Sequence, residues 1–257
     1  MNQKFNQIHA DAQIGENVII EPFTTVAGDV SIGEGTWIGP NVTIMDGARI
    51  GKNCRVFPGA VISAIPQDMK FEGEKSTTEI GDNTTIREFV TVNRGTKASY
   101  KTMIGKNCLL MAYVHIAHDC VVGNNCIIVS YAGLAGEVVL HDWVTVSACS
   151  LVHQFVHIGN HAFIGGAARV RKDVPPYIKA DRDPLSYVGI NSIGLKRRNF
   201  SDEKISELHE IYRTLYMKKM NIAQSLEIIE REFPSSEERN TIISFVKNSS
   251  RGIIKGY

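Results

Sequence analysis

The sequence predicts a mainly β protein in which short parallel strands wind into a stacked coil, followed by a C-terminal α-helical segment. Three observations support this fold class. An aliphatic residue recurs at every sixth position from Ile8 to Val170. Ile and Val far outnumber Leu before residue 190, which favours strands over helices. After the sequence V-P-P-Y at 174–177, the apolar residues change to helical spacing.

The six-residue repeat is almost unbroken. Stepping by six from Ile8 reaches 28 positions, and 25 of them are Ile, Leu or Val; the exceptions are Asp68, Glu74 and Ala98. A period of six is neither the two of a plain strand nor the 3.6 of a helix, so it indicates a repeat protein. Small residues recur four positions after the aliphatics, often with Gly or Asn between them at a turn. Three repeats then form one triangular coil of 18 residues, and about nine coils stack as parallel strands.

Two domains follow from this pattern. Residues 1–189 are expected to form the coil, and residues 190–257 a helical domain. Residues 63–79 and 93–103 interrupt the repeat and predict loops, which often carry binding residues on a rigid scaffold. In the second domain we expect helices from Ser201, over 222–233 and over 236–246, covering the open end of the sheets. The first of these carries apolar residues at helical spacing: Ile205, Leu208, Ile211, Tyr212 and Leu215.

The composition limits the function classes. The net charge of +1 argues against a general polyanion binder. Residues 190–257 carry 12 basic and 9 acidic residues, a net +3 that is compatible with an acidic partner. No apolar run reaches membrane-spanning length and no signal-peptide core precedes the repeats, so we expect a cytoplasmic protein.

The five cysteines show no C-x-x-C pair and no metal-type spacing. Four of them follow a repeat aliphatic by four residues, where Val, Thr, Ala and Ser otherwise stand, and are expected to be small buried wall residues: Cys54, Cys108, Cys120 and Cys126. Cys149 lies off that register, and nothing near it in the sequence indicates a nucleophile.

The 18-residue coil also predicts a site. His118, Gly136 and Gln154 stand 18 apart, each two residues after a repeat aliphatic, and therefore form one column at a corner. An imidazole, a glycine N–H that can be approached closely and an amide could together hold a hydroxyl nucleophile and an oxyanion. Asp119 follows His118 and can orient its ring. The alternative is a pair of surface histidines on the edge of the coil.

A zinc site is not expected here. His115 and His118 would point in different directions, and the positions one or two coils earlier offer Asn93 and Asn83 instead of a third histidine. A structural or catalytic zinc ion needs at least three protein ligands around one centre.

Several longer motifs point to one family. They are Q-D-M-K-F-x-G-E, I-R-E-x-V-T-V-N-R-G-T, L-L-M-x-x-x-H-I-A-H-D-C, V-H-Q-F, D-V-P-P-Y and G-L-K-R-R-x-F. Together they resemble the UDP-N-acetylglucosamine O-acyltransferases of lipid A biosynthesis, nearly end to end. The resemblance implies a left-handed parallel β-helix of hexapeptide repeats. It also implies transfer of a 3-hydroxyacyl chain from acyl carrier protein to the sugar 3-hydroxyl, in a cleft between the subunits of a homotrimer.

The resemblance assigns roles to particular residues. His118 would be the general base, Asp119 would orient it, and the Gly136 N–H would stabilise the oxyanion. No cofactor is implied, because the acyl donor is carried on the phosphopantetheine of acyl carrier protein. The residues expected near the sugar or the acyl 3-hydroxyl are Gln67, Asp68, Lys70, His115 and Gln154.

Four further residues are assigned by the same resemblance. Asn191 and Arg198 would contact the uridine and diphosphate, and Arg197 the phosphopantetheine or carrier side. Gly166 stands at the position that limits acyl chain length and leaves room for a long chain. Two departures affect the nucleotide contacts: Glu137 replaces a histidine that many relatives have beside the diphosphate, and Ile193 replaces an acidic residue near the ribose. A carboxylate beside a diphosphate is unfavourable unless it is turned away or paired.

Two other functions are compatible with the repeat. The related N-acyltransferase of the same pathway normally carries an extra N-terminal uridine-binding domain, whereas the repeats here begin at Ile8. A non-catalytic β-helix binding trimer would share the fold, but His118, Asp119 and Gly136 argue against it.

Overall fold

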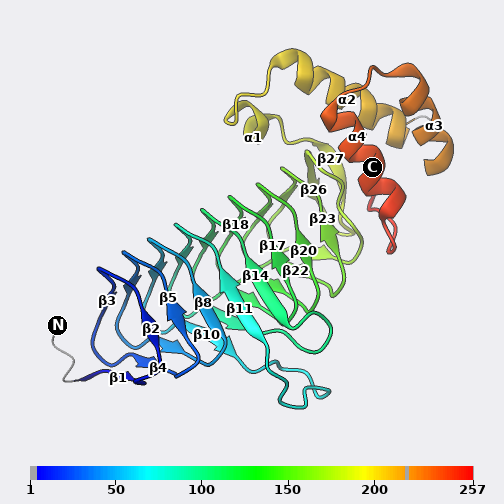
Figure 1. Ribbon diagram of the computed structural model, residues 1–257. Coiled ribbons are helices and arrows are strands. Elements are labelled where there is room, and N and C mark those ends of the chain that lie inside the picture. The colour runs from blue at the N-terminus through cyan, green and yellow to red at the C-terminus, as the bar shows by residue number, and fades with distance from the viewer. Residues whose placement is uncertain (1–4, 218–219, 257) are drawn as a thin grey trace.

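The computed structural model describes residues 5–217 and 220–256. The chain winds into a triangular prism whose three faces are sheets of parallel strands, apart from one antiparallel pair, Ile178–Asp181 with Ser186–Ile190, and the helices lie at its C-terminal end (Figure 1). The expected β coil and the helical domain that covers its open end are therefore confirmed. Among the described residues, no helix is both long and apolar enough to cross a membrane.

Most strands are only two residues long, because each face of a coil spans a single repeat. The first sheet contains β1 (Gln7–Ile8), β4 (Thr25–Val26), β7 (Thr43–Ile44), β10 (Val61–Ala64), β13 (Thr91–Asn93), β16 (His115–Ile116), β19 (Gly133–Leu134), β22 (Leu151–Val152) and β25 (Arg169–Val170). The second contains β2 (Gln13–Ile14), β5 (Ser31–Ile32), β8 (Ala48–Ile50), β11 (Thr77–Ile80), β14 (Lys101–Ile104), β17 (Val121–Val122), β20 (Val139–Leu140) and β23 (His157–Ile158). The third contains β3 (Ile19–Ile20), β6 (Trp37–Ile38), β9 (Arg55–Val56), β12 (Thr85–Ile86), β15 (Leu109–Leu110), β18 (Ile127–Ile128), β21 (Thr145–Val146), β24 (Phe163–Ile164), β26 (Ile178–Asp181), β27 (Ser186–Ile190) and β28 (Lys255–Gly256).

The strand register confirms the 18-residue coil. In the first sheet His115 pairs with Gly133, which pairs with Leu151 in the next coil. Each repeat aliphatic points inward, so Ile116 and Leu134 are almost fully buried. The four on-register cysteines are buried as expected and Cys149 is exposed. Burial raises the pKa of the Cys120 thiol to about 12, so this residue is a wall side chain and not a nucleophile.

Each corner of the prism contains a residue in the left-handed region. The first corner, between the first and second sheets, has Asp119 and Glu137 at φ of 59° and 61°. The second corner, between the second and third sheets, has Trp143 and His161 at 64° and 59°. The third corner, between the third and first sheets, repeats the pattern with Tyr131 at 62°. Non-glycine residues are strained in this region, and hydrogen bonds between adjacent coils hold them there, such as the one from Glu137 N–H to His118 O at 3.0 Å.

The two predicted loops are present but shorter than expected. The first joins β10 to β11 over residues 65–76, and the second joins β13 to β14 over residues 94–100. They are shorter because β11 and β14 extend to four residues each and pair along their whole length.

The helical domain contains α1 (Ser192–Lys196), α2 (Asp202–Met217), α3 (Ile222–Glu232) and α4 (Glu237–Asn248). The last three match the expected helices, and the caps follow the sequence: Asn221 forms a capping box at α3 and Ser236 caps α4. The short α1 and the strands β26 to β28, which extend the third sheet under the helices, were not expected. Tyr212 joins the domains, because its buried hydroxyl donates to Pro176 O at 2.6 Å.

Candidate active site

A groove of about 570 Å³ runs along the first sheet beside the first corner. Four of the residues predicted for the site lie together in its wall: Gln67, His115, His118 and Gly136. The remaining wall is mostly small or apolar and ends in two arginines: Asn93, Ala117, Gly133, Leu134, Ala135, Leu151, Val152, His153, Arg169, Val170 and Arg171. A groove with few polar groups in an apolar wall is typical of a small-molecule site.

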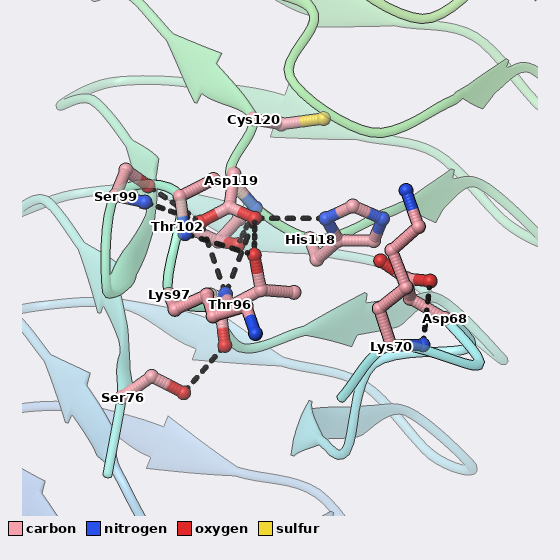
Figure 2. Close-up of polar contacts among 12 residues, drawn as sticks. Asp68, Lys70, Ser76, Thr96, Lys97, Ser99, Thr102, His118, Asp119 and Cys120 are labelled. Carbon is pink, nitrogen blue, oxygen red and sulfur yellow. Dashed lines mark hydrogen bonds and ion pairs between the residues drawn. The ribbon is translucent and has the colours of Figure 1, made fainter. Parts of the chain in front are cut away.

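His118 and Asp119 form a hydrogen-bonded pair at this groove (Figure 2). The distance from His118 Nδ1 to Asp119 Oδ2 is 2.8 Å, the His118 side chain is 19% exposed and the Asp119 side chain is fully buried. An ionised carboxylate can only accept, so Nδ1 carries the proton and Nε2 presents its lone pair. The left-handed conformation of Asp119 makes this contact between neighbouring residues possible by turning its side chain at the corner.

The second loop surrounds the Asp119 carboxylate with donors. Thr96 donates its hydroxyl to Oδ2 at 2.6 Å and its N–H to Oδ1 at 3.0 Å. Ser99 donates its hydroxyl to Oδ1 at 2.6 Å and its N–H to the same oxygen at 3.2 Å. Burial alone would raise the pKa of Asp119, but the hydrogen bonds from Ser99, Thr96 and His118 outweigh it and hold the pKa below its ordinary value. Asp119 is therefore a buried, ionised acceptor.

Gly136 lies directly above the His118 ring in the next coil. A methyl group at its α-carbon would be 2.6 Å from Cε1 and 2.7 Å from Nε2 of His118, so only glycine fits. Within residues 5–217 and 220–256, the Gly136 N–H has no hydrogen-bond acceptor. It is thus available to a ligand in the groove.

Gln154, the third member of the column, is placed differently. It is exposed and does not line the groove, whereas its neighbour His153 does. The column His118–Gly136–Gln154 is present in the fold, but only its first two residues meet at the groove, and the role of Gln154 stays a prediction.

The first loop brings Asp68 and Lys70 to the same region. In Figure 2 both lie on the side of the His118 ring that faces away from Asp119. Asp68 organises the loop, because its Oδ1 accepts the Lys70 N–H at 3.0 Å and its backbone carbonyl accepts the Phe71 N–H. The Lys70 side chain is exposed and free to reach a ligand.

His115 stands beside His118 in the groove wall. Its Nδ1 is 2.7 Å from the hydroxyl oxygen of Thr91 in the preceding coil, and burial lowers the pKa of the ring. His115 is therefore suited to hydrogen bonding as a neutral group.

The residues predicted for the nucleotide lie at the second corner, away from this groove. Arg198 Nη1 is 3.2 Å from His161 Nδ1, and its guanidinium lies 4.9 Å from the centre of the Trp143 ring. Burial, with Arg198 adding to it, lowers the pKa of His161 to about 4. Asn191 caps α1 and donates to His161 O at 2.9 Å.

Arg197 and Gly166 are also separate from the groove within one chain. Arg197 is exposed at the end of α1, and Gly166 is exposed at the third corner, where an added methyl group would contact only Ala148 O at 3.6 Å. One chain therefore distributes the predicted substrate residues over three corners of the prism. The two residues that depart from the family pattern lie at the surface of the prism and of α1. Glu137 is half-buried at the first corner, and Ile193 on α1 is 67% exposed.

Sequence reasoning missed Thr96, Ser99 and Asn93. Thr96 and Ser99 lie in a loop that interrupts the repeat, so periodicity cannot place them beside Asp119, which is 23 and 20 residues away. The interruption of the repeat over this loop was the only sequence feature that pointed to these two residues. Asn93 is buried in the groove wall and donates to Ile65 O at 3.0 Å; its amide oxygen has no partner among the described residues.

No group of three or more His, Cys, Asp and Glu side chains could hold a metal ion in the part of the chain that the structure describes. His118 and His115 each have one ring nitrogen engaged by a neighbouring side chain. These are hydrogen-bonding sites of the kind used in acid–base chemistry.

Comparison with known proteins links this geometry to one family. A family model described as "Udp N-acetylglucosamine O-acyltransferase; Domain 2" matches residues 173–254, and a model of bacterial transferase hexapeptide repeats matches residues 29–64 and 101–136. The acyl-[acyl-carrier-protein]–UDP-N-acetylglucosamine O-acyltransferase of Xylella fastidiosa is 41% identical over 99% of this chain and all of its own length. That of Gloeothece citriformis is 42% identical over 68% of this chain, which spans 64% of that relative.

Solved structures of acyltransferases resemble this chain over nearly its whole length. The UDP-N-acetylglucosamine acyltransferase of Bacteroides fragilis superposes with a TM-score of 0.97 at 48% identity, covering 99% of this chain and 100% of the other. The Francisella novicida enzyme gives 0.95 at 39% identity, covering 98% and 92%. Together with the repeat model, these likenesses confirm the left-handed β-helix.

Proposed function

The chain belongs to the family of acyl-[acyl-carrier-protein]–UDP-N-acetylglucosamine O-acyltransferases, and we propose that it transfers a 3-hydroxyacyl group to the sugar 3-hydroxyl with His118 as general base. This is the first step of lipid A biosynthesis. One observation carries the mechanism: Asp119 holds the proton of His118 on Nδ1, which leaves Nε2 as an acceptor beside Gly136.

The reaction begins with the sugar hydroxyl. His118 Nε2 removes its proton as the hydroxyl oxygen attacks the thioester carbonyl, and Asp119 stabilises the imidazolium that forms. The carbonyl oxygen becomes an oxyanion, to which the unpaired Gly136 N–H donates. The tetrahedral intermediate then releases the phosphopantetheine thiolate, which takes the proton back from His118. An ester bond has formed and a thioester bond has broken, with no change in oxidation state.

The proposed route needs no metal ion or cofactor, because His118 moves the proton and the Gly136 N–H stabilises the oxyanion.

The two substrates are UDP-N-acetylglucosamine and an acyl group on the phosphopantetheine of acyl carrier protein. We expect Arg171 at the end of the groove and the exposed Arg197 to contact the carrier or its phosphate, together with Arg169, which is paired with Asp183 in the free chain. The cytoplasmic location expected from the sequence stays a prediction.

The remaining substrate residues support assembly as a homotrimer. Gln67, Asp68, Lys70, His115 and Gln154 belong to the first corner or its loop, whereas Asn191 and Arg198 belong to the second corner and Gly166 to the third. A single prism cannot bring three corners to one substrate. Three prisms packed around a threefold axis can place different corners of neighbouring subunits side by side.

The test is an assay of purified protein with UDP-N-acetylglucosamine and 3-hydroxyacyl carrier proteins of several chain lengths. We expect His118→Ala to lower kcat by at least about 100-fold, the usual contribution of a general base. Gln154→Ala serves as a control for general disturbance of the corner and is expected to act mainly on KM for the sugar nucleotide.

Full activity of His118→Ala would contradict the general-base role. Turnover only with the 3-O-acylated glucosamine would indicate the N-acyltransferase reaction instead. Loss of activity on adding a chelator, with recovery on adding a metal ion, would contradict the metal-independent route.

A further inference from the structure

The three positions that break the six-residue repeat all lie in the two loops beside the catalytic pair: Asp68, Glu74 and Ala98. These loops are bonded to each other. Glu74 Oε1 accepts the Lys97 N–H at 2.9 Å. The Ser76 hydroxyl donates to Gly95 O at 2.5 Å, a contact drawn from the labelled Ser76 in Figure 2. The first loop, which carries Gln67 and Asp68, therefore also holds the second loop against Asp119.

Thr96 is the most strictly oriented donor in the second loop. It is 6% exposed, and its hydroxyl oxygen accepts the Ala98 N–H at 3.2 Å. That contact occupies a lone pair and directs the single hydroxyl hydrogen at Asp119 Oδ2, 2.6 Å away. Ser99 is less restricted, because its hydroxyl lies near both Asp119 Oδ1 at 2.6 Å and Lys101 O at 2.8 Å.

Oδ2 is also the oxygen that accepts from His118. Thr96 and His118 thus donate to the same atom of a fully buried carboxylate. A donor on that oxygen stabilises its charge and weakens its attraction for the proton on the neighbouring ring. A carboxylate without that donor would stabilise the imidazolium more strongly.

We propose that Thr96 is a positioning residue for the acyl transfer: its hydroxyl fixes Asp119 and limits the negative charge that Asp119 presents to the His118 ring. This inference rests on the function proposed above. Thr96 touches neither substrate in this role and acts only through Asp119.

The test is the pH dependence of kcat/KM for wild type, Thr96→Val and Thr96→Ser. The acidic limb of this profile reports protonation of the base in the free enzyme. Thr96→Val keeps the shape of the side chain but removes the donor, so the acidic limb of its profile should move to higher pH. Thr96→Ser keeps the hydroxyl, and its limb should stay at the wild-type position.

The other titratable and charged groups around the ring are unchanged by these substitutions, so a shift reports the Asp119 contact: Asp68, Lys70, His115, Glu137, His153, Arg169 and Arg171. The matched control is Thr84→Val. Thr84 is also buried, but its hydroxyl donates to Gly105 O at 2.8 Å at the second corner of the prism, and it does not line the groove. Thr84→Val should lower the free energy of unfolding without moving the acidic limb of the pH profile of kcat/KM.

The outcomes separate the two proposals. If wild type shows no acyl transfer, the proposed function itself is wrong. If wild type is active and the limb of Thr96→Val does not rise, or Thr84→Val shows the same rise, the role of Thr96 is wrong. Should Thr96→Val fail to fold, Ser99→Ala removes a second donor from Asp119 and must move the limb in the same direction by a smaller amount.

Discussion

Gly136 contributes both a backbone N–H and an absent side chain to the proposed active site. Its N–H has no acceptor among the described residues, it has no side chain, and the His118 ring occupies the space that a Cβ atom would need. Any larger residue must displace the imidazole, which is the group that moves the proton. The glycine therefore contributes by its lack of bulk as much as by its N–H.

We expect Gly136→Ala to lower kcat/KM by about 100-fold, since a displacement of about 1 Å at a reacting group has effects of that size. The measurement is steady-state kinetics, with the unfolding midpoint recorded alongside. Gly28→Ala is the matched control, because its added methyl group would also approach an imidazole, that of the exposed His9 at 3.0 Å, but on an early coil. Equal activities of the two variants would contradict the assignment of Gly136.

At the scale of elements, the second corner joins the coil to the helical domain. The His161 ring stacks on Trp143 and Tyr177, at centroid distances of 6.1 and 5.6 Å. Arg198 and Phe200, from the segment after α1, contact the same ring. A neutral imidazole suits this position, because the ring is partly buried and a guanidinium lies beside it.

This contact predicts a loss of stability on acidification. The pKa of His161 is lowered from 6.5 to about 4, so between these values the unfolded chain binds a proton that the folded chain does not. The free energy of unfolding therefore falls as the pH decreases through this window and is fully retained above it. The urea midpoint of wild type should fall more between pH 7 and pH 5 than that of His161→Gln.

His209→Gln provides the control for this experiment, because His209 is an exposed histidine on α2. Its pH dependence should match that of wild type. If the urea midpoint of His161→Gln depended on pH as that of wild type does, protonation of His161 would not be the cause of the loss of stability.

At the scale of the whole molecule, the prism separates the predicted substrate residues. His118 and Gly136 stand at the first corner, Arg198 and Asn191 at the second, and Gly166 at the third. The separation follows from the coil, in which each turn of 18 residues visits all three corners. If these predicted residues act on one substrate, they must come from more than one chain, which is the basis of the proposed trimer.

Mixed assemblies test this arrangement. His118→Ala and Arg198→Ala subunits, each of low activity alone, should regain activity when they are co-expressed with different tags and purified through both. A groove that combines an intact His118 from one subunit with an intact Arg198 from its neighbour forms only in the mixture. Light scattering gives the subunit number, and mixed assemblies no more active than the separate variants would contradict a shared site.

Much of the fold and part of the site could be predicted from sequence because both follow from a short period. The aliphatic repeat determined the coil, and the coil placed His118 beneath Gly136. The loops interrupt the period, and the contacts made by their residues could not be predicted from it. Gln154 shares the column but is exposed and does not line the groove, so position in the repeat alone did not decide which side chains meet there.

The sequence by itself determined the prism, its interrupted loops, the buried cysteines and the pairing of His118 with Gly136, because a regular repeat converts residue number directly into position. Only the tertiary structure decided what the irregular segments do. It brought Thr96 and Ser99 onto Asp119 and tied the two loops together through Glu74. Loop conformations depend on hydrogen bonds to distant groups and follow no period, so they are settled only when the whole chain is folded.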